Sequence, residues 1–148
     1  MPNVDLTIRP ARIQDAEAIT ALTTELGYPS EEAEMRRRIE RLLQSDAHFL
    51  AVAERDTRLI GWVAAERRLV LESGERAELV GLIVTAYARR SGAGQALVNA
   101  AEKWAVRQGM SSIFVRSNIT RLESHPFYER LGYVRTKTQH AYSKRLSD

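Results

Sequence analysis

Residues 78–97 read ELVGLIVTAYARRSGAGQAL, and this stretch decides the fold. After Glu78, the segment 79–84 is apolar at nearly every position, which is typical of a central strand covered on both faces. Residues from about 94 to 108 then repeat apolar side chains at helical spacing. Gly92 and Gly94 lie between the two patterns and mark a tight turn. The sequence therefore predicts a central strand, a glycine turn and a long amphipathic helix.

Working outward, the pattern predicts strands and helices along the rest of the chain. Their order is β-α-α-β-β-β-α-β-α-β-β, which favours the α/β class: a mixed sheet with helices on both faces. Because no linker or low-complexity tract interrupts the chain, we expect one domain over residues 1–148. The expected strands are 6–9, 48–54, 59–71, 78–84, 112–116, 133–137 and 140–146, and the expected helices are 15–26, 30–43 with Ser30 as N-cap, 94–108 and 123–130.

Composition excludes several classes of protein. The chain has 148 residues, is 44% hydrophobic and contains no cysteine, so disulfides and thiolate chemistry are excluded. No apolar run approaches the ~20 residues of a membrane helix. The first ten residues contain Asp5 and no apolar run, so we expect a cytoplasmic protein. The three histidines have no metal-ligand spacing, and no metal is expected.

The glycine turn is a candidate anion site. The first N–H groups of a helix are unpaired and the helix dipole adds partial positive charge, so such a turn binds phosphate. Arg89 and Arg90 add full charges beside it. A P-loop motif is absent, and Leu97 occupies the third-glycine position of the dinucleotide fingerprint. A diphosphate ligand or a plain glycine loop both remain open from the residues alone.

The sequence Arg89-x-x-Gly92-x-Gly94 resembles the acyl-CoA signature, Q/R-x-x-G-x-G/A, of GNAT N-acetyltransferases. Downstream, FYERLGY at residues 127–133 is similar to the family motif F-Y-x-x-x-G-F/Y. The two motifs stand in family order with the expected elements between them. The resemblance covers nearly the whole chain and implies the GNAT fold and an acetyl-CoA-dependent N-acetyltransferase.

The resemblance also implies how acetyl-CoA would bind. The pantetheine arm would lie along the strand segment Leu82, Ile83 and Val84, and would pair with the main chain of Leu82 and Val84. A main-chain N–H near the end of this strand would polarise the thioester carbonyl. The pyrophosphate would rest on the turn formed by Arg89, Arg90, Ser91, Gly92, Ala93, Gly94 and Gln95.

Two residues are candidate catalytic groups under the same resemblance. Tyr128 matches the family tyrosine that protonates the departing thiolate, and Glu78 has the spacing of a catalytic glutamate, four residues before Leu82. Deprotonating a lysine-like amine at pH 7 costs about 4.6 kcal/mol, so a base would help. Glu78 is alternatively a solvated residue at the start of the strand. Arg121 stands where many relatives carry asparagine, and His125 is either a helix-start residue or part of a proton relay.

The acceptor is expected to be a primary amine of a small molecule or peptide that attacks the thioester directly. In the family the acceptor site includes the connection of the first two helices, here near Tyr28. The alternative is a catalytically inactive CoA-binding sensor or interaction module. A nucleic-acid binder is a third hypothesis, because residues 130–147 carry five basic and no acidic side chains, but a sheet edge explains this stretch more simply. We expect no nucleic-acid or membrane partner, and a homodimer is possible.

Overall fold

A computed structural model describes residues 5–89, 91–116 and 124–147 of the chain. The chain forms two compact units, and the boundary between them follows Arg116. The first unit contains the sheet and three long helices, and the second contains one short helix and the C-terminal segment.

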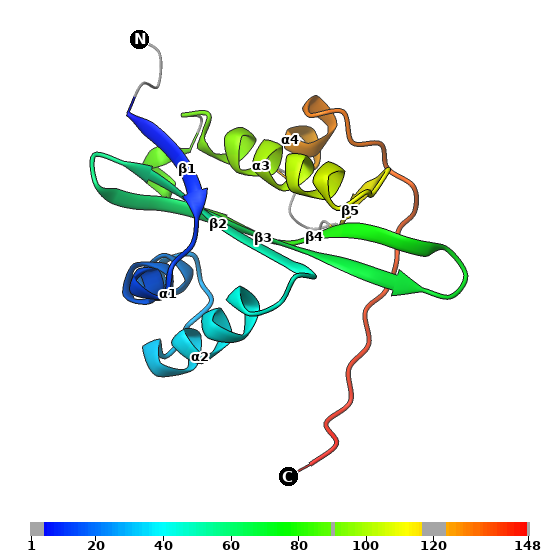
Figure 1. Cartoon of the computed structure of the whole chain (residues 1–148), viewed down its shortest axis with the longest axis horizontal. Helices are drawn as coiled ribbons and strands as arrows, with labels where there is room; N and C mark the ends of the chain where they lie inside the picture. Colours follow the sequence, from blue (N-terminus) through cyan, green and yellow to red (C-terminus); the bar gives the residue numbers. More distant parts are fainter. Residues whose placement is uncertain (1–4, 90, 117–123, 148) are drawn as a thin grey trace. The chain divides into compact units, whose positions relative to one another are not determined.

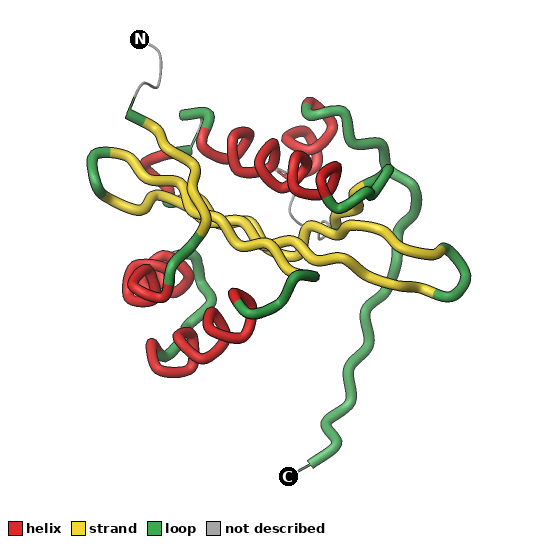
Figure 2. The backbone as a smooth tube through the Cα atoms, viewed as in Figure 1, coloured by secondary structure: helices red, strands yellow, loops and turns green. Residues whose placement is uncertain are grey.

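The first unit is built on a five-stranded sheet in the order β1-β2-β3-β4-β5 (Figures 1 and 2). Neighbouring strands from β1 to β4 are antiparallel, whereas β5 runs parallel to β4. The predicted mixed sheet is therefore confirmed. The strands are β1 (Leu6–Pro10), β2 (His48–Arg55), β3 (Arg58–Val70), β4 (Gly74–Val84) and β5 (Ile113–Val115).

Helices cover both faces of this sheet. Figure 1 shows α1 (Ala16–Glu25) and α2 (Glu32–Leu43) on one face and α3 (Ala93–Arg107) on the other. Two short 3-10 helices, η1 (Ile13–Asp15) and η2 (Ala86–Ala88), precede α1 and α3. The α1/α2 layer packs apolar side chains of both helices on β2 and β3. This core contains Ala11, Ala16, Ile19, Met35, Ile39, Leu50 and Val52.

Two neighbouring residues of β3 show which way the sheet faces. The Nε1 of Trp62 donates to Thr23 Oγ1 of α1 at 3.1 Å, so Trp62 lies on the α1/α2 face. Gly61 faces α3: a Cβ at this position would stand 2.6 Å from Ile83 O and 3.1 Å from Leu97 Cδ1. The missing side chain therefore allows α3 to pack closely on the strands.

The start of α2 differs from the prediction. Its N-cap is Glu31 rather than Ser30. The hydroxyl of Ser30 instead donates to Tyr28 O at 3.1 Å and closes the preceding turn. A serine hydroxyl at a helix start can form a hydrogen bond either with the first turn of the helix or with the preceding turn, and here it bonds within the preceding turn.

The second unit begins, within its described part, with α4 (Ser124–Arg130), as predicted. The two strands predicted at 133–137 and 140–146 are wrong: residues 133–147 form neither strand nor helix. Alternation alone does not make a strand, because the backbone needs a neighbouring strand to accept its hydrogen bonds. The apolar side chains of this segment are not buried, and Tyr142 is 93% exposed.

Asp15 joins β1 to the helical layer through a buried carboxylate. It accepts two hydrogen bonds from the Arg9 guanidinium, both at 2.9 Å, and one from the Arg12 backbone N–H at 2.8 Å. The hydrogen bonds from Arg9 are the largest cause that lowers the pKa of Asp15 below its ordinary value. Since the folded pKa is the lower one, Asp15 stabilises the fold fully above the ordinary value of 3.8 and progressively less as the pH falls below it.

Asp15→Asn is expected to lower the free energy of unfolding at pH 7 by about 3 kcal/mol, because it leaves Arg9 without its buried partner. Urea unfolding of wild type and variant should give a difference that shrinks as the pH falls below 4. The exposed Asp46→Asn serves as the control and should change stability by less than about 0.5 kcal/mol. A difference for Asp15→Asn that is constant from pH 7 to pH 3 would contradict this assignment.

Candidate functional site

The edge of β4 is open along its second half. Within the described residues, β5 pairs with β4 only from Ala77 to Leu79, where Leu79 is opposite Val115. β4 continues to Val84 while it remains paired with β3 on its other side. The β4–β5 ladder thus ends at Leu79, and the described residues provide no β5 partner for the following five residues of β4, 80–84.

A β-bulge lies directly after the end of the β4–β5 ladder. Ala64 is opposite Gly81 and Ala65 is opposite Leu79, so Val80 is one extra residue in β4. A bulge of this kind bends the strand, raises its local twist and re-aims its main-chain groups. The bulge therefore changes the direction of the main-chain groups of β4 just beyond its ladder with β5.

The register shows which main-chain groups face the open edge. Thr85 N–H donates to Ile60 O at 2.8 Å, which makes this a hydrogen-bonded antiparallel pair. Such pairs alternate with non-bonded pairs, so the N–H and C=O groups of Leu82 and Val84 point away from β3. Those of Ile83 point toward β3, and its side chain is buried. Leu82 and Val84 thus present the groups that a ligand running along this edge would pair with.

The N-terminus of α3 follows this edge in the chain. Gly92 is the N-cap and has φ = +92°, a conformation that favours glycine. The first intrahelical bond runs from Ala96 N–H to Gly92 O at 3.0 Å. The N–H groups of Ala93, Gly94 and Gln95 therefore have no helical carbonyl one turn earlier. These N–H groups lie where the glycine turn predicts an anion site.

The residues before Gly92 lie in a tight turn. Arg89 is exposed, and its N–H donates to Ala86 O at 3.3 Å. Ser91 donates its N–H to Ala88 O at 3.2 Å, and its hydroxyl donates to the same oxygen. Ser91 thus directs these two donors into the turn, and its expected place at the pyrophosphate stays a prediction. The predicted contribution of Arg90 lies outside the described residues, as does Arg121.

Thr85 fixes the junction between β4 and this turn. It is fully buried, and its hydroxyl donates to Glu25 Oε2 at the end of α1 at 2.7 Å. This contact ties the end of the open edge to the α1/α2 layer. Thr85 is not among the residues predicted from the sequence, although a polar residue directly after an apolar strand is a detectable signal of such a junction.

Glu78 lies under a group of three arginines, which we call the arginine cluster: Arg68, Arg76 and Arg116. Glu78 Oε1 is 2.9 Å from Arg68 Nη1 and 3.9 Å from Arg76 Nη2, and Oε2 is 3.7 Å from Arg116 Nη1. The Glu78 side chain is 7% exposed. Both carboxylate oxygens are thus turned to guanidinium groups, which leaves little access for an amine.

The arginine cluster was missed by the sequence analysis. The charges in the middle of the predicted strand 59–71 are a signal, because Arg68 lies opposite Arg76 and Glu66 opposite Glu78 in the register. Opposed charged residues in neighbouring strands indicate a polar face rather than a core. Finding the partner of Arg116 required the position of β5.

Tyr128 belongs to the second unit, where it lies in an aromatic group with its motif neighbours. Its ring packs edge-on against Phe127, with centroids 5.1 Å apart, and against Tyr133, at 5.7 Å. The Tyr133 N–H donates to Tyr128 O at 3.0 Å across the turn that contains Gly132, whose φ is +94°. The motif at 127–133 therefore holds Tyr128 by ring packing and by a helix-ending turn.

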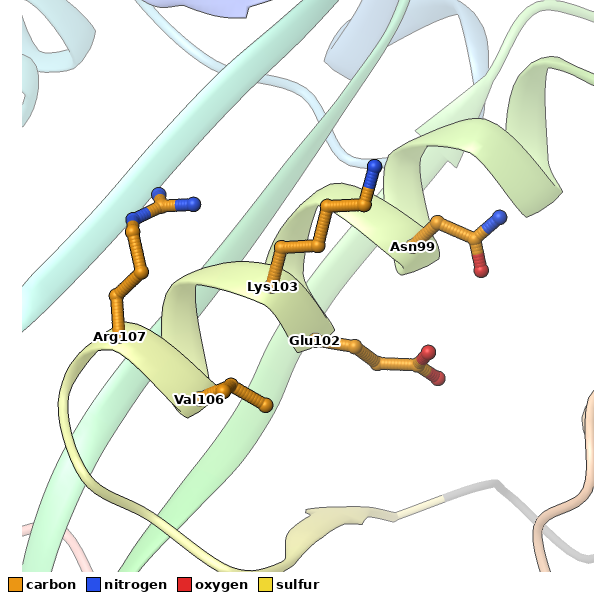
Figure 3. A pocket seen from close by; sticks show the side chains of 5 residues that line it. All are labelled: Asn99, Glu102, Lys103, Val106 and Arg107. Atoms are coloured by element: carbon orange, nitrogen blue, oxygen red, sulfur yellow. The ribbon is translucent and has the colours of Figure 1, made fainter.

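A shallow hollow of about 510 Å³ lies on α3, away from the predicted site residues. Figure 3 shows its side chains projecting from successive turns of the helix. They share one helix face by their spacing. The hollow lacks the enclosed apolar lining of a small-molecule site. Its lining residues are Asn99, Glu102, Lys103, Val106 and Arg107.

The described residues contain no group of three His, Cys, Asp or Glu side chains that could hold a metal ion. Their helices are also too short or too polar to span a bilayer.

Comparison with known proteins identifies the family. The model of the Acetyltransferase (GNAT) family matches residues 16–133. The uncharacterized N-acetyltransferase CT2212 of Chlorobaculum tepidum is 32% identical over 133 residues, which cover 90% of this chain and 78% of the relative. The uncharacterized N-acetyltransferase YhdJ of Bacillus subtilis is 26% identical over 66% of this chain and 70% of its own. The chain therefore belongs to the GNAT family of acetyltransferases.

Solved structures agree on the fold. The aminoglycoside N-acetyltransferase AAC(6')-Iy in complex with CoA has a TM-score of 0.86 at 22% identity, with 95% of each chain covered. The aminoglycoside 6'-N-acetyltransferase AAC(6')-IG from Acinetobacter haemolyticus has a TM-score of 0.82 at 23% identity, covering 95% of this chain and 99% of its own. The predicted GNAT fold is thus confirmed.

Proposed function

We propose that this protein transfers an acetyl group from acetyl-CoA to a primary amine by direct attack on the thioester. The observation that carries the proposal is the end of the β4–β5 ladder at Leu79, which, among the described residues, leaves the edge of β4 unpaired as the chain runs toward the N-terminus of α3. The open edge of β4 offers main-chain groups to an extended arm, and the N-terminus of α3 offers N–H groups to a pyrophosphate. Acetyl-CoA contains an extended pantetheine arm and a pyrophosphate, joined in one molecule.

The order of these parts sets the direction of the bound cofactor. The pyrophosphate lies on the N–H groups of residues 92–95, at the far end of the open edge. The pantetheine arm then runs back past Val84 and Leu82, which spans about 13 Å of strand from residue 80 to 84. The thioester therefore lies toward the bulge at Val80, where a re-aimed main-chain N–H stabilises the developing oxyanion.

The reaction forms a C–N bond and breaks the C–S bond. The neutral amine nitrogen attacks the thioester carbon, the tetrahedral intermediate collapses, and the CoA thiolate leaves. The amine gives up one proton to water, and the thiolate takes one either directly from water or from Tyr128, which water then reprotonates. Because the chain has no cysteine, no acyl-cysteine intermediate forms and the transfer is direct.

We further propose that both compact units act as one catalytic domain, because the family match at 16–133 crosses the boundary after Arg116. The second candidate is a CoA-binding module without catalysis. The two are separated by incubating the protein with acetyl-CoA and a broad amine panel while free CoA thiol is measured. Release that depends on an amine supports the enzyme. Saturable acetyl-CoA binding without amine-dependent release supports the module.

Tyr128→Phe is expected to lower kcat about tenfold or more, because the departing thiolate loses its proposed proton donor. The affinity for acetyl-CoA should stay within about threefold, since the ring and its packing remain. Thiol release and equilibrium binding measure the two effects.

Tyr133→Phe is the matched control for this change. It lies in the same aromatic group, with its ring centroid 5.7 Å from that of Tyr128. We expect its kcat to remain within about twofold of wild type. Equal kcat values for wild type, Tyr128→Phe and Tyr133→Phe would contradict a catalytic role of Tyr128.

A further inference from the structure

The charge balance around Glu78 leaves an excess of positive charge. The Glu78 carboxylate faces the three guanidinium groups of the arginine cluster at distances of 2.9 to 3.9 Å. Its cross-strand neighbour Glu66 instead pairs with His48 at 3.4 Å, so the two carboxylates still do not balance the three guanidinium groups. In the described part of the chain, Arg76 Nε is buried without a hydrogen-bond partner. The guanidinium of Arg76 also lies over the Phe114 ring, 4.3 Å from its centroid. One carboxylate does not satisfy this many donors, so the cluster can accept a second anion.

The arginine cluster lies on the α1/α2 face of the sheet. Arg68 is six residues beyond Trp62 in β3, and side chains two residues apart share a face. Trp62 contacts α1, so Arg68 and its opposite residue Arg76 lie on that same face. The face turned to α3 is left to Leu82 and Val84, because their opposite residues are Val63 and Gly61. An acceptor on the cluster would therefore not compete with α3 for space.

The cluster also lies close to the proposed position of the thioester. Glu78 is two residues before the bulge at Val80, which is about 7 Å along a strand. An amine whose nitrogen attacks at Val80 places a group a few ångströms away from that nitrogen beside the cluster. Arginine recognises a carboxylate through two parallel hydrogen bonds, which fixes orientation as well as position.

We propose that the arginine cluster binds a carboxylate of the acceptor, so that the acceptor is a small amine of amino-acid type. This inference rests on the proposed acetyl transfer and names its substrate class. Glu78 then holds the guanidinium groups in place instead of taking the amine proton. Aminoglycosides carry several positive charges, so the cluster would repel them.

The test compares each of the twenty amino acids with its α-carboxamide as acceptor, with thiol release as the readout. Wild type should prefer at least one carboxylate over its carboxamide by about tenfold in kcat/KM. Arg116→Gln and Arg68→Gln should reduce this ratio to about threefold or less while activity on the carboxamide stays within about threefold. Arg116 is the safer variant for folding, because its side chain is 65% exposed. Arg38→Gln on α2 is the control and should leave the ratio unchanged.

Three outcomes count against the inference: no preference for the carboxylate, a preference that survives both variants, or better turnover of an aminoglycoside such as sisomicin. If no amine at all releases thiol while acetyl-CoA binds, the proposed function fails. The cluster is then tested by calorimetry with the N-acetylated amino acids and their amides on the CoA-loaded protein. Tighter binding of the carboxylates that disappears in Arg116→Gln supports the anion site, and equal binding overturns it.

Discussion

Gly92→Asp is expected to lower the affinity for acetyl-CoA by about 100-fold or more. The substitution places a carboxylate at the N-cap of α3, beside the N–H groups of residues 93–95 that we propose bind the pyrophosphate. The negative charge would occupy this proposed site and repel the phosphates. Aspartate tolerates a positive φ better than most residues and is also a good N-cap, so the helix should persist. Calorimetric titration with acetyl-CoA measures the loss.

Gly109→Asp is the matched control. Gly109 follows the other end of α3, has a φ of +84°, and has open space around its missing Cβ. The variant therefore adds the same side chain at a similar backbone conformation, far from the N-terminal N–H groups. We expect its affinity for acetyl-CoA to stay within about twofold of wild type. If both variants bind acetyl-CoA as wild type does, the glycine turn does not hold the phosphates.

Glu78→Gln is expected to lower the free energy of unfolding by about 3 kcal/mol. Removing this charge leaves three guanidinium groups facing one another across a neutral amide. Arg68 and Arg76 are partly buried, so water screens their repulsion incompletely. Because Arg116 is mostly exposed, its share of the loss is small. Urea unfolding at pH 7 gives the value directly.

Glu75→Gln is the control for Glu78→Gln on the same strand. Glu75 makes one exposed ion pair, 3.5 Å from Arg67 Nε, and its loss should cost less than about 1 kcal/mol. The same proteins distinguish the two roles of Glu78. A structural anchor predicts lower stability with an unchanged pH profile of kcat in the folded enzyme. A general base predicts near-normal stability and loss of the acidic limb of that profile, which would contradict the anchor.

The fold could be predicted from the sequence wherever local pattern and burial agree. The segment 78–84 and the helix after Gly92 are strongly patterned, and both elements are present within a few residues of their expected bounds. The segment 133–147 shows the limit. Its alternation suits a strand, but whether a strand forms depends on a pairing partner, and a partner is a property of the three-dimensional arrangement.

The candidate site, like the fold, could be predicted only in part from the sequence. Glycines and flanking arginines identify the anion end of α3 because backbone conformation restricts the residue types allowed there. The sequence does not indicate that the Ser91 hydroxyl donates to Ala88 O within the turn. The arginine cluster depends on the register of β3 with β4 and on the position of β5. Such contacts between distant residues leave only weak traces in a single sequence.

The bulge at Val80 sets the phase of β4. Side chains alternate strictly along a strand, so one extra residue exchanges the faces of everything on one side of it. Glu78 would otherwise share a face with Leu82 and Val84; with the insertion it shares one with Gly81 and Ile83. Pairing Val80 as a regular residue of β4, without the bulge, would thus turn the side chains on one side of it to the opposite face of the sheet. The charged segment that ends at Glu78 would then share a face with Leu82 and Val84, the residues proposed to pair with a ligand.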